Sequence, residues 1–520
     1  MTNARERALQ DKATGGVASL PLEVDACSKE ATLRLDPWRR SQMGQFLTPG
    51  PIATFMAGMF HCRKSEVRIL DPGAGTGSLC AALVLALCQR PKRPSTIALT
   101  AYEIDPLLVG YLRSTLERCR VACEEIGISF QGRLVEEDFL EAGGSALAGD
   151  LFARGEQERF DCAILNPPYR KIRTESRERA LLRSIGLETT NLYTGFVAVA
   201  ARLLVPCGEM VAITPRSFCN GPYFEPFRRY FLREMRFRRV HVFDTRDTAF
   251  ADDRVLQENV VFHAVRNEEI SPVVVSASIG PGDVGLRMRT VKHEEIVRPR
   301  DRHAFIHIVS EEDGESIRHR IRSLGGSLSD LGLTVSTGRV VDFRSTELLR
   351  ADPGRNTVPL IYPCHLKQGF VEWPNGKTRK PNALALGPRT EELLVPEGHY
   401  VLTKRFSAKE ERRRIVAAVY APARVTATQI AFENHLNYFH AQGGGLPVTL
   451  AKGLTAYLNS SVVDTYFRQF SGHTQVNASD LRSLPYPVRS ALIALGRRIG
   501  KSFPAQEELD RLVDEVIFHG

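Results

Sequence analysis

Short apolar runs alternate with longer segments of helical period in the first half of the chain. Residues 67–70, 96–102 and 160–165 are apolar runs of strand length, and residues 79–87 have helical composition. Strands that alternate with helices are typical of a doubly wound, mostly parallel α/β sheet. Two further apolar runs, at residues 240–244 and 260–265, are predicted as the last strands of this sheet, with a polar loop over 246–253 between them.

The pattern changes after residue 265. Apolar and polar residues alternate over 270–300, which favours strands that bridge two units. A new unit is predicted to begin at residues 333–344 and to end at residues 471–481. The last thirty residues carry an apolar stripe at helical spacing, which favours packing over a partner helix. The predicted division is an N-terminal extension (1–40), a catalytic domain (41–270), a connecting segment (271–325), an α+β module (326–490) and a C-terminal helical segment (491–520).

A glycine-rich turn follows the first predicted strand. Asp71-Pro72-Gly73-Ala74-Gly75-Thr76-Gly77 stands between a strand and a helix, where glycine lets the main chain approach a ligand closely. The spacing is not that of the dinucleotide fingerprint, and no Lys-Ser/Thr pair follows, which excludes a P-loop. Glu103, at the tip of the second strand, is placed to hold a ribose diol. Asp138 and Phe139, at a third strand end, could bond and stack an adenine.

The tetrapeptide Asn166-Pro167-Pro168-Tyr169 ends the predicted strand 160–165. An exocyclic base amine is a poor nucleophile because its lone pair is delocalised into the ring. An amide oxygen and a fixed main-chain carbonyl can accept both of its N–H groups and free the lone pair. The two prolines restrict the backbone, and the tyrosine offers a face for stacking a base. The pattern therefore favours activation of an amine, and the alternative interpretation is an ordinary proline-rich turn between a strand and a loop.

These motifs, in this order, resemble the gamma class of amino-methyltransferases acting on DNA. Residues from about 40 to 265 are similar to the N6-adenine enzymes of type II restriction–modification systems, and the layout faintly resembles the XhoI group. The resemblance implies an α/β fold with the doubly wound, mostly parallel sheet of S-adenosylmethionine-dependent methyltransferases, followed by an α+β target-recognition domain. It also implies that Tyr193 to Phe196 begin the helix of the next motif.

The resemblance assigns roles residue by residue. The expected S-adenosylmethionine ligands are Gln45, Phe46, Thr48 and Pro49 at the methionine end, Asp71, Gly73, Gly75 and Gly77 in the loop, Glu103 and Ile104 at the ribose and adenine, and Asp138 and Phe139 at the adenine edge. The expected catalytic residues are Asn166, Pro167, Pro168 and Tyr169. Tyr169 is expected to stack on an extruded base, and Tyr223 or Phe224 to close its other face. No metal is expected.

Composition agrees with a polyanionic partner. The chain has 520 residues, a formal net charge of +9 and ten scattered cysteines, which are read as buried residues of a reducing cytoplasm. No apolar run is long enough for a bilayer span. We therefore expect a cytoplasmic, nucleoid-associated bacterial protein that binds double-stranded DNA and no membrane. It is expected as a monomer, with a restriction endonuclease as its functional partner.

Several alternatives stay open. Pro206-Cys207, Glu258-Asn259-Val260 and Arg287-Met288-Arg289 follow the order of cytosine-C5 methyltransferase motifs, but Cys207 is expected in a turn and not as a nucleophile. RNA adenine, a protein amide or cytosine N4 could be the substrate. A fused nuclease and a non-enzymatic DNA-binding remnant are disfavoured.

Basic and aromatic residues interleave in two segments, 228–239 and 404–414. Each is interpreted either as a solvated helix face or as a phosphate contact that positions DNA without reading its sequence.

Overall fold

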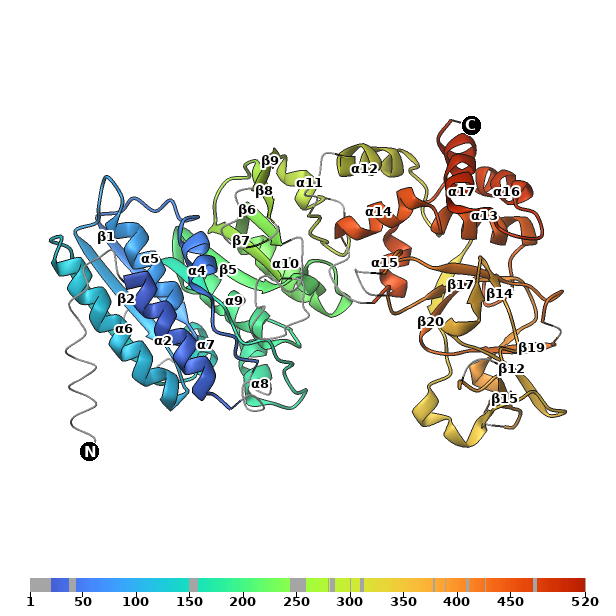
Figure 1. Ribbon diagram of the computed structural model, residues 1–520, viewed down its shortest axis with the longest axis horizontal. Coiled ribbons are helices and arrows are strands. Elements are labelled where there is room, and N and C mark those ends of the chain that lie inside the picture. The colour runs from blue at the N-terminus through green and yellow to red at the C-terminus, as the bar shows by residue number, and fades with distance from the viewer. Residues whose placement is uncertain are drawn as a thin grey trace. The chain divides into compact units, whose positions relative to one another are not determined.

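The computed structural model describes residues 20–36, 44–148, 158–243, 259–278, 280, 286–299, 301–308, 313–376, 379–388, 390–407, 411–425, 427–470 and 475–519. The chain divides into two compact units, Met1–Ser310 and Glu311–Gly520 (Figure 1). Within the described residues, no helix is both long and apolar enough to cross a bilayer.

The first unit is built on one large sheet. Within its described part the strand order is β3-β2-β1-β4-β5-β7-β6-β8-β9. The strands are β1 (Glu66–Pro72), β2 (Thr96–Tyr102), β3 (Ser129–Val135), β4 (Phe160–Leu165), β5 (Leu204–Pro215), β6 (Met235–Phe243), β7 (Asn259–Arg266), β8 (Val273–Ser278) and β9 (Arg287–Val291). The strands predicted from apolar runs are confirmed at β1, β2, β4, β6 and β7.

Strand direction changes along this sheet. The strands from β3 to β5 run parallel to one another, whereas β7 pairs antiparallel with both β5 and β6. The sheet is the mostly parallel α/β sheet that the sequence predicts. Since parallel strands end at the same edge, the loops after β1, β2, β3 and β4 meet there.

Helices cover both faces of the sheet. Alternate strand residues point to opposite faces, so that Ile69 and Ile164 pack in the same cluster as α4 and α5, while Leu70 and Ala163 pack in the cluster of α9. The helices are α2 (Leu20–Arg34), α4 (Gly50–Ala57), α5 (Ser78–Cys88) and α6 (Pro106–Glu124) on one face, and α7 (Phe139–Ala148), α8 (Arg177–Ser184), α9 (Leu192–Leu203) and α10 (Glu225–Glu234) on the other (Figure 1).

The expected connecting segment, 271–325, lies on both sides of the boundary between the units. Strand β8 pairs parallel with β6, and β9 pairs antiparallel with β8, so both extend the first sheet. Helix α12 (Asp313–Ser323) belongs to the second unit. The expected polar loop at 246–253 lies outside the described residues.

The described residues of the cytosine-C5 pattern are not assembled into a site, and Glu258 lies outside the described residues. Cys207 is exposed, has a backbone φ of 61°, and lies near the start of β5. Leu204 pairs with Phe160 at the start of the parallel strand β4, so Cys207 lies at the sheet edge opposite to Asn166. The sequence predicts Cys207 in a turn, but the structure places it within β5, where the pairing with β4 is irregular and its backbone is left-handed.

Two arginines of the basic segment 228–239 are bonded within the first unit. Arg228 is fully buried and donates hydrogen bonds to the carbonyl oxygens of Phe218, Gly221 and His303. Arg238 pairs with Glu268. A phosphate contact is therefore wrong for Arg228, because its donors are already satisfied inside the unit.

The second unit combines two sheets with a group of helices. Its described strands form one sheet in the order β10-β20-β17-β18-β14-β13 and another in the order β11-β15-β12-β19-β16. The strands are β10 (Thr334–Thr337), β11 (Leu349–Arg350), β12 (Thr357–Ile361), β13 (Leu366–Lys367), β14 (Phe370–Val371), β15 (Ala383–Ala385), β16 (Leu394–Pro396), β17 (Tyr400–Lys404), β18 (Ala417–Tyr420), β19 (Gln429–Phe432) and β20 (Leu436–His440). The helices after α12 are α13 (Val448–Leu458), α14 (Ser461–Phe470), α15 (Ala478–Ser483), α16 (Arg489–Arg498) and α17 (Gln506–Val513).

The C-terminal helices share a hydrophobic core with the first of these sheets. Leu492 and Leu509, from the predicted apolar stripe, are buried with Val401 and Phe439 of the strands. The stripe therefore packs inside the second unit, as its spacing predicts.

Two glycines set the closest approach of α13 and α16. A Cβ on Gly453 would lie 1.8 Å from the main-chain oxygen of Leu492, and one on Gly496 would lie 1.7 Å from that of Thr449. Any larger residue would force the helix backbones apart.

We expect Gly453→Ala to destabilise the second unit by about 1–3 kcal/mol, the usual cost of an overpacked core. Gly500→Ala is the matched control, because no atom lies within 4 Å of its added Cβ. Urea unfolding of the full chain measures the difference. Equal unfolding midpoints for the two variants would contradict the tight helix contact.

Candidate active site

A pocket opens at the carboxyl edge of the parallel strands, where the predicted motifs converge. It encloses about 710 Å³ of space outside the atoms, its open mouth included. The predicted site residues in its lining are Gln45, Phe46, Gly73, Gly75, Glu103, Ile104, Asp138, Phe139, Asn166 and Pro168.

The glycine turn forms one wall of the pocket. Gly73 and Gly75 have φ values of 76° and 60°, in the region that favours glycine. The amides of Gly73 and Ala74 both donate to the carbonyl oxygen of Tyr102, at 2.9 and 2.8 Å. A Cβ on Gly75 would lie 2.9 Å from the Leu47 side chain. The turn and the segment before α4 are therefore in contact where both line the pocket.

Two predicted glycine-turn residues lie outside the lining. Gly77 faces α6, since an added Cβ would meet Thr115 at 2.8 Å. Asp71 is fully buried, and burial raises the pKa of its carboxyl group to about 7. Neither position lines the pocket.

Glu103 is held by the main chain. Its carboxylate accepts hydrogen bonds from the amides of Gly75 (2.9 Å), Ile104 (2.8 Å) and Asp105 (2.8 Å). Two of these bonds reach one oxygen, so the other keeps a free lone pair toward the pocket. Burial raises the pKa of Glu103. Ile104 is 46% exposed at the pocket wall, an apolar surface suited to a flat ring.

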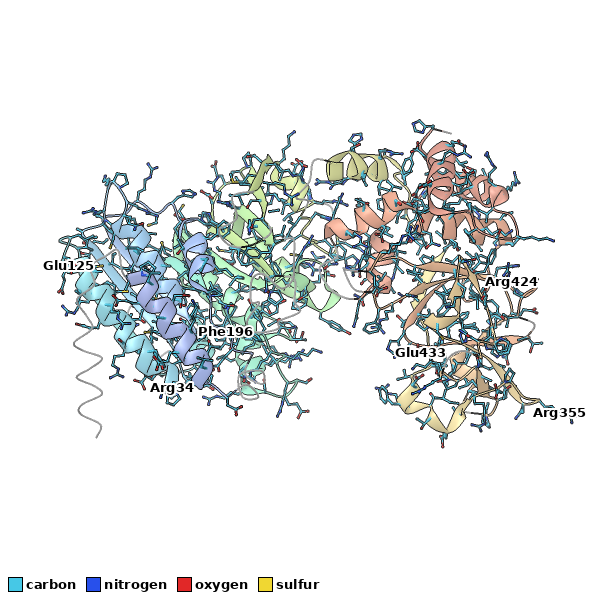
Figure 2. All side chains as sticks on the ribbon, in the orientation of Figure 1. Arg34, Glu125, Phe196, Arg355, Arg424 and Glu433 are labelled. Atoms are coloured by element: carbon cyan, nitrogen blue, oxygen red, sulfur yellow. The ribbon has the colours of Figure 1, made fainter. Side chains whose placement is uncertain are left out.

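Asp138 and Phe139 form another part of the pocket wall. One oxygen of Asp138 accepts from the amides of Leu140 (2.8 Å) and Glu141 (3.1 Å), which caps the start of α7. The Phe139 ring lies 5.2 Å from the rings of Tyr102 and Phe196. Phe196 comes from α9 (Figure 2).

The side-chain amide of Asn166 has a defined orientation. Its Nδ2 donates to the carbonyl oxygen of Phe46 (2.8 Å) and to the hydroxyl of Thr48 (3.0 Å). A carbonyl oxygen can only accept, so the nitrogen must face Phe46. Oδ1 therefore points the other way, and no described residue donates to it. The site presents a hydrogen-bond acceptor at the end of β4.

Tyr169 is held beside this amide. Its amide nitrogen donates to the carbonyl oxygen of Gly44 at 3.0 Å, and its hydroxyl donates to that of Ile213 at 3.2 Å. Its ring lies 5.9 Å from Phe46 and meets Tyr193 edge-on at 6.1 Å. Burial raises the pKa of its phenol well above the ordinary value.

Comparison with known proteins identifies the family. A family model described as "Eco57I restriction-modification methylase" matches residues 123–250. The type II methyltransferase M.PstI of Providencia stuartii is 42% identical over 510 residues, which cover 98% of this chain and 99% of that protein. M.BsuBI of Bacillus subtilis is 42% identical over 484 residues, covering 92% and 95%. The chain belongs to the type II methyltransferases of restriction–modification systems.

A solved structure shares the fold of this methyltransferase. The type IIL restriction–modification enzyme MmeI, solved in complex with DNA, has a TM-score of 0.51 at 12% identity, covering 89% of this chain and 71% of that one. The first unit is the α/β fold of the S-adenosylmethionine-dependent methyltransferases. The gamma class and the XhoI-like group stay predictions.

The two expected second stacking residues of the methyltransferase differ in exposure. Phe224 is 8% exposed and lies 5.7 Å from the Tyr193 ring, whereas Tyr223 is 72% exposed. Among the described residues, no group of three or more His, Cys, Asp or Glu side chains could hold a metal ion.

Sequence reasoning missed part of the pocket lining. The missed residues are Gly44, Leu47, Tyr102, Leu108, Glu137, Arg170, Leu192 and Phe196. Phe196 stands in a segment that the motif order had indicated, but its position against the pocket depends on how α9 packs. Conversely, Thr48 and Pro49 lie behind the lining, where Thr48 contacts Asn166 and Pro49 precedes α4.

We expect Asp138→Asn to weaken cofactor binding about tenfold without loss of stability. The asparagine oxygen can still cap α7. Its NH2 group, however, replaces the acceptor oxygen that faces the pocket, and one lost hydrogen bond costs about 1 kcal/mol. Titration calorimetry with S-adenosylhomocysteine measures the dissociation constant. The thermal unfolding midpoint reports whether the cap of α7 is kept. Asp138→Ala should lower both this midpoint and the affinity for S-adenosylhomocysteine. Wild-type affinity in Asp138→Asn would remove Asp138 from the cofactor site.

Proposed function

We propose that this methyltransferase transfers a methyl group from S-adenosylmethionine to the N6 amine of adenine in double-stranded DNA. The orientation of the Asn166 amide is the observation that supports this most directly. An acceptor oxygen at the end of β4, beside a pocket lined by Glu103, Ile104 and Asp138, suits a substrate amine next to a nucleoside-bearing cofactor.

Two acceptors act on the target amine. Asn166 Oδ1 and the main-chain carbonyl of Pro167 accept hydrogen bonds from its two N–H groups, which draws the nitrogen toward tetrahedral geometry and frees its lone pair. Tyr169 lies next to these acceptors, with its backbone and hydroxyl both held. A base inside a duplex cannot reach this edge, so it must leave the stack, and Tyr169 offers it an aromatic face.

The residues around the pocket fit S-adenosylmethionine, which supplies an electrophilic methyl group when bound. The free lone pair of Glu103 suits the ribose diol, and exposed Ile104 suits one face of the adenine. The second oxygen of Asp138 suits the adenine amine. Gln45 and Phe46, at the pocket wall beside Asn166, suit the methionine end. These residues bind and orient the two substrates, and positioning contributes much of the rate.

We further propose that the second unit selects the DNA sequence and that methylation protects the site from a partner endonuclease. The family relatives match along both units, which supports a duplex DNA substrate over RNA adenine or a protein amide. Cytosine N4 is the second candidate, because the same pair of acceptors suits its amine. The protein is expected to act as a monomer.

Asn166→Ala should abolish methyl transfer and leave cofactor affinity within about tenfold, because the lost oxygen contacts the target amine in the transition state. Radiolabel transfer from S-adenosylmethionine to DNA measures the activity. Mass spectrometry of the wild-type product, digested to nucleosides, distinguishes N6-methyladenine from N4-methylcytosine.

A near wild-type rate of methyl transfer in Asn166→Ala would contradict the role assigned to the Asn166 side chain. N4-methylcytosine as the product would replace adenine with cytosine as the substrate while keeping the role of Asn166.

A further inference from the structure

The segment 44–48 contacts the pocket on one side and the catalytic tetrapeptide on the other. Gly44, Gln45, Phe46 and Leu47 line the pocket. The same segment supplies the Gly44 carbonyl to the amide of Tyr169, and the Phe46 carbonyl and Thr48 hydroxyl to the amide of Asn166. One short stretch of chain therefore holds both groups that the reaction needs.

Thr48 and Phe46 together use both hydrogens of the Asn166 amide. If the amide turned over, Oδ1 would face the Phe46 carbonyl, and two acceptors without a hydrogen repel each other. The Thr48 hydroxyl lies 3.0 Å from Nδ2, and the threonine is 5% exposed. Without the hydroxyl, one N–H would be buried without a partner and the amide plane would be free to tilt about its remaining bond.

We propose that Thr48 is a positioning residue for methyl transfer: its hydroxyl holds the plane of the Asn166 amide, whose direction the Phe46 carbonyl sets, so that Oδ1 stays aimed at the target amine. This inference rests on the proposed function of Asn166. Thr48 does not line the pocket, so its effect is expected on the chemical step and not on cofactor binding.

The test compares three threonine variants. Thr48→Val keeps the shape and removes the hydroxyl, and we expect kcat to fall about tenfold, the size of one lost hydrogen bond, with KM for S-adenosylmethionine within about twofold. Thr48→Ser keeps the hydroxyl and should restore kcat. Thr54→Val is the matched control, because Thr54 is exposed on the next helix, α4.

The outcomes for the Thr48 variants decide whether the hydroxyl positions the Asn166 amide. Thr48→Val with wild-type kcat would overturn the inference, and so would a Thr48→Ser variant as slow as Thr48→Val, since packing alone would then explain the loss. If Thr48→Val fails to fold, Thr48→Ala supplies the same comparison with a smaller side chain. An active Asn166→Ala would instead defeat the proposed function itself.

A second, independent observation lies in the second unit. Glu433, labelled in Figure 2, is fully buried, yet its carboxylate accepts two hydrogen bonds from a single, largely exposed residue, His435. One comes from the His435 amide at 2.9 Å and the other from ring atom Nδ1. A buried carboxyl group needs hydrogen-bond partners, and both of these bonds go to one residue, so Glu433 sets the orientation of the His435 ring.

Neighbouring residues hold the ring further. The Phe406 ring lies 4.9 Å from that of His435. Arg405 donates its main-chain amide to the His435 carbonyl at 2.8 Å and its side chain to the Asn434 carbonyl at 3.2 Å. Since Nδ1 is bound to Glu433, ring atom Nε2 faces away from the carboxylate, and no described residue bonds to it.

The basic segment 404–414 thus has mixed roles. Arg414 is buried and bonded to Ser407, and Lys409 lies outside the described residues. Arg405 supports the loop that carries His435. A phosphate contact is wrong for Arg414, because a buried guanidinium cannot reach a DNA backbone.

We infer that His435 contacts a base edge of the DNA target through Nε2, with Glu433 as its positioning residue. A fixed ring gives a hydrogen bond in one direction, which suits the reading of a base better than the looser contact of a phosphate by a flexible cation. This inference rests on the proposed role of the second unit in sequence selection.

The test is modified-base sequencing of DNA from cells that express each variant. His435→Ala should relax the methylated sequence at one position, with discrimination there reduced about tenfold. Glu433→Gln should relax the same position to a smaller degree. His519→Ala is the matched control, because His519 is an exposed histidine of the same unit, bonded to Asp514.

An unchanged methylated sequence in His435→Ala would overturn the inference. A loss that is uniform over all sequences, with the salt dependence of DNA binding reduced by about one ion, would identify a phosphate contact and would also overturn it. If the wild-type chain left no methylated sequence in the host, the proposed function would fail instead.

Discussion

The chemistry proposed for this protein depends on one hydrogen bond, from the Asn166 amide to the carbonyl oxygen of Phe46. Because a carbonyl can only accept, this bond decides which end of the amide faces the substrate. The partners are 120 residues apart in the chain. They meet because β1 and β4 are adjacent and parallel, which brings the loop after β4 beside the glycine turn, and Leu47 of the segment before α4 packs against that turn at Gly75.

Hydrogen bonds to the main chain also orient the other polar side chains of the pocket. Glu103 and Asp138 each use part of their carboxylate on main-chain amides and keep the remainder for the pocket. Such groups are oriented before a ligand arrives, so binding does not have to order them. Burial favours the neutral form of Glu103 and raises its pKa, but three amide donors stabilise the carboxylate in the orientation that the pocket needs.

Basic residues show how composition can mislead. Arg228 and Arg414 stand in arginine-rich segments that suggest DNA contacts, yet both are buried and bonded within their own units. A guanidinium has five donors, and main-chain carbonyls at chain turns satisfy them well. Net charge therefore indicates a polyanionic partner for the whole chain without identifying the residues that touch it.

The sequence by itself determined three strands of the parallel half-sheet (β1, β2 and β4), the glycine turn and the Asn166 tetrapeptide. These features are local: alternation, glycine spacing and proline restriction are all decided within a few residues. It also indicated most of the pocket wall, since acids at strand ends converge wherever strands are parallel.

Tertiary structure decided the rest. It placed Thr48 against the Asn166 amide and outside the pocket lining, buried Asp71 completely, and added β8 and β9 to the first sheet. It also paired buried Glu433 with exposed His435. Each of these outcomes depends on which atoms meet across the fold, and burial and hydrogen-bond partners are properties of that packing that no local pattern of residues encodes.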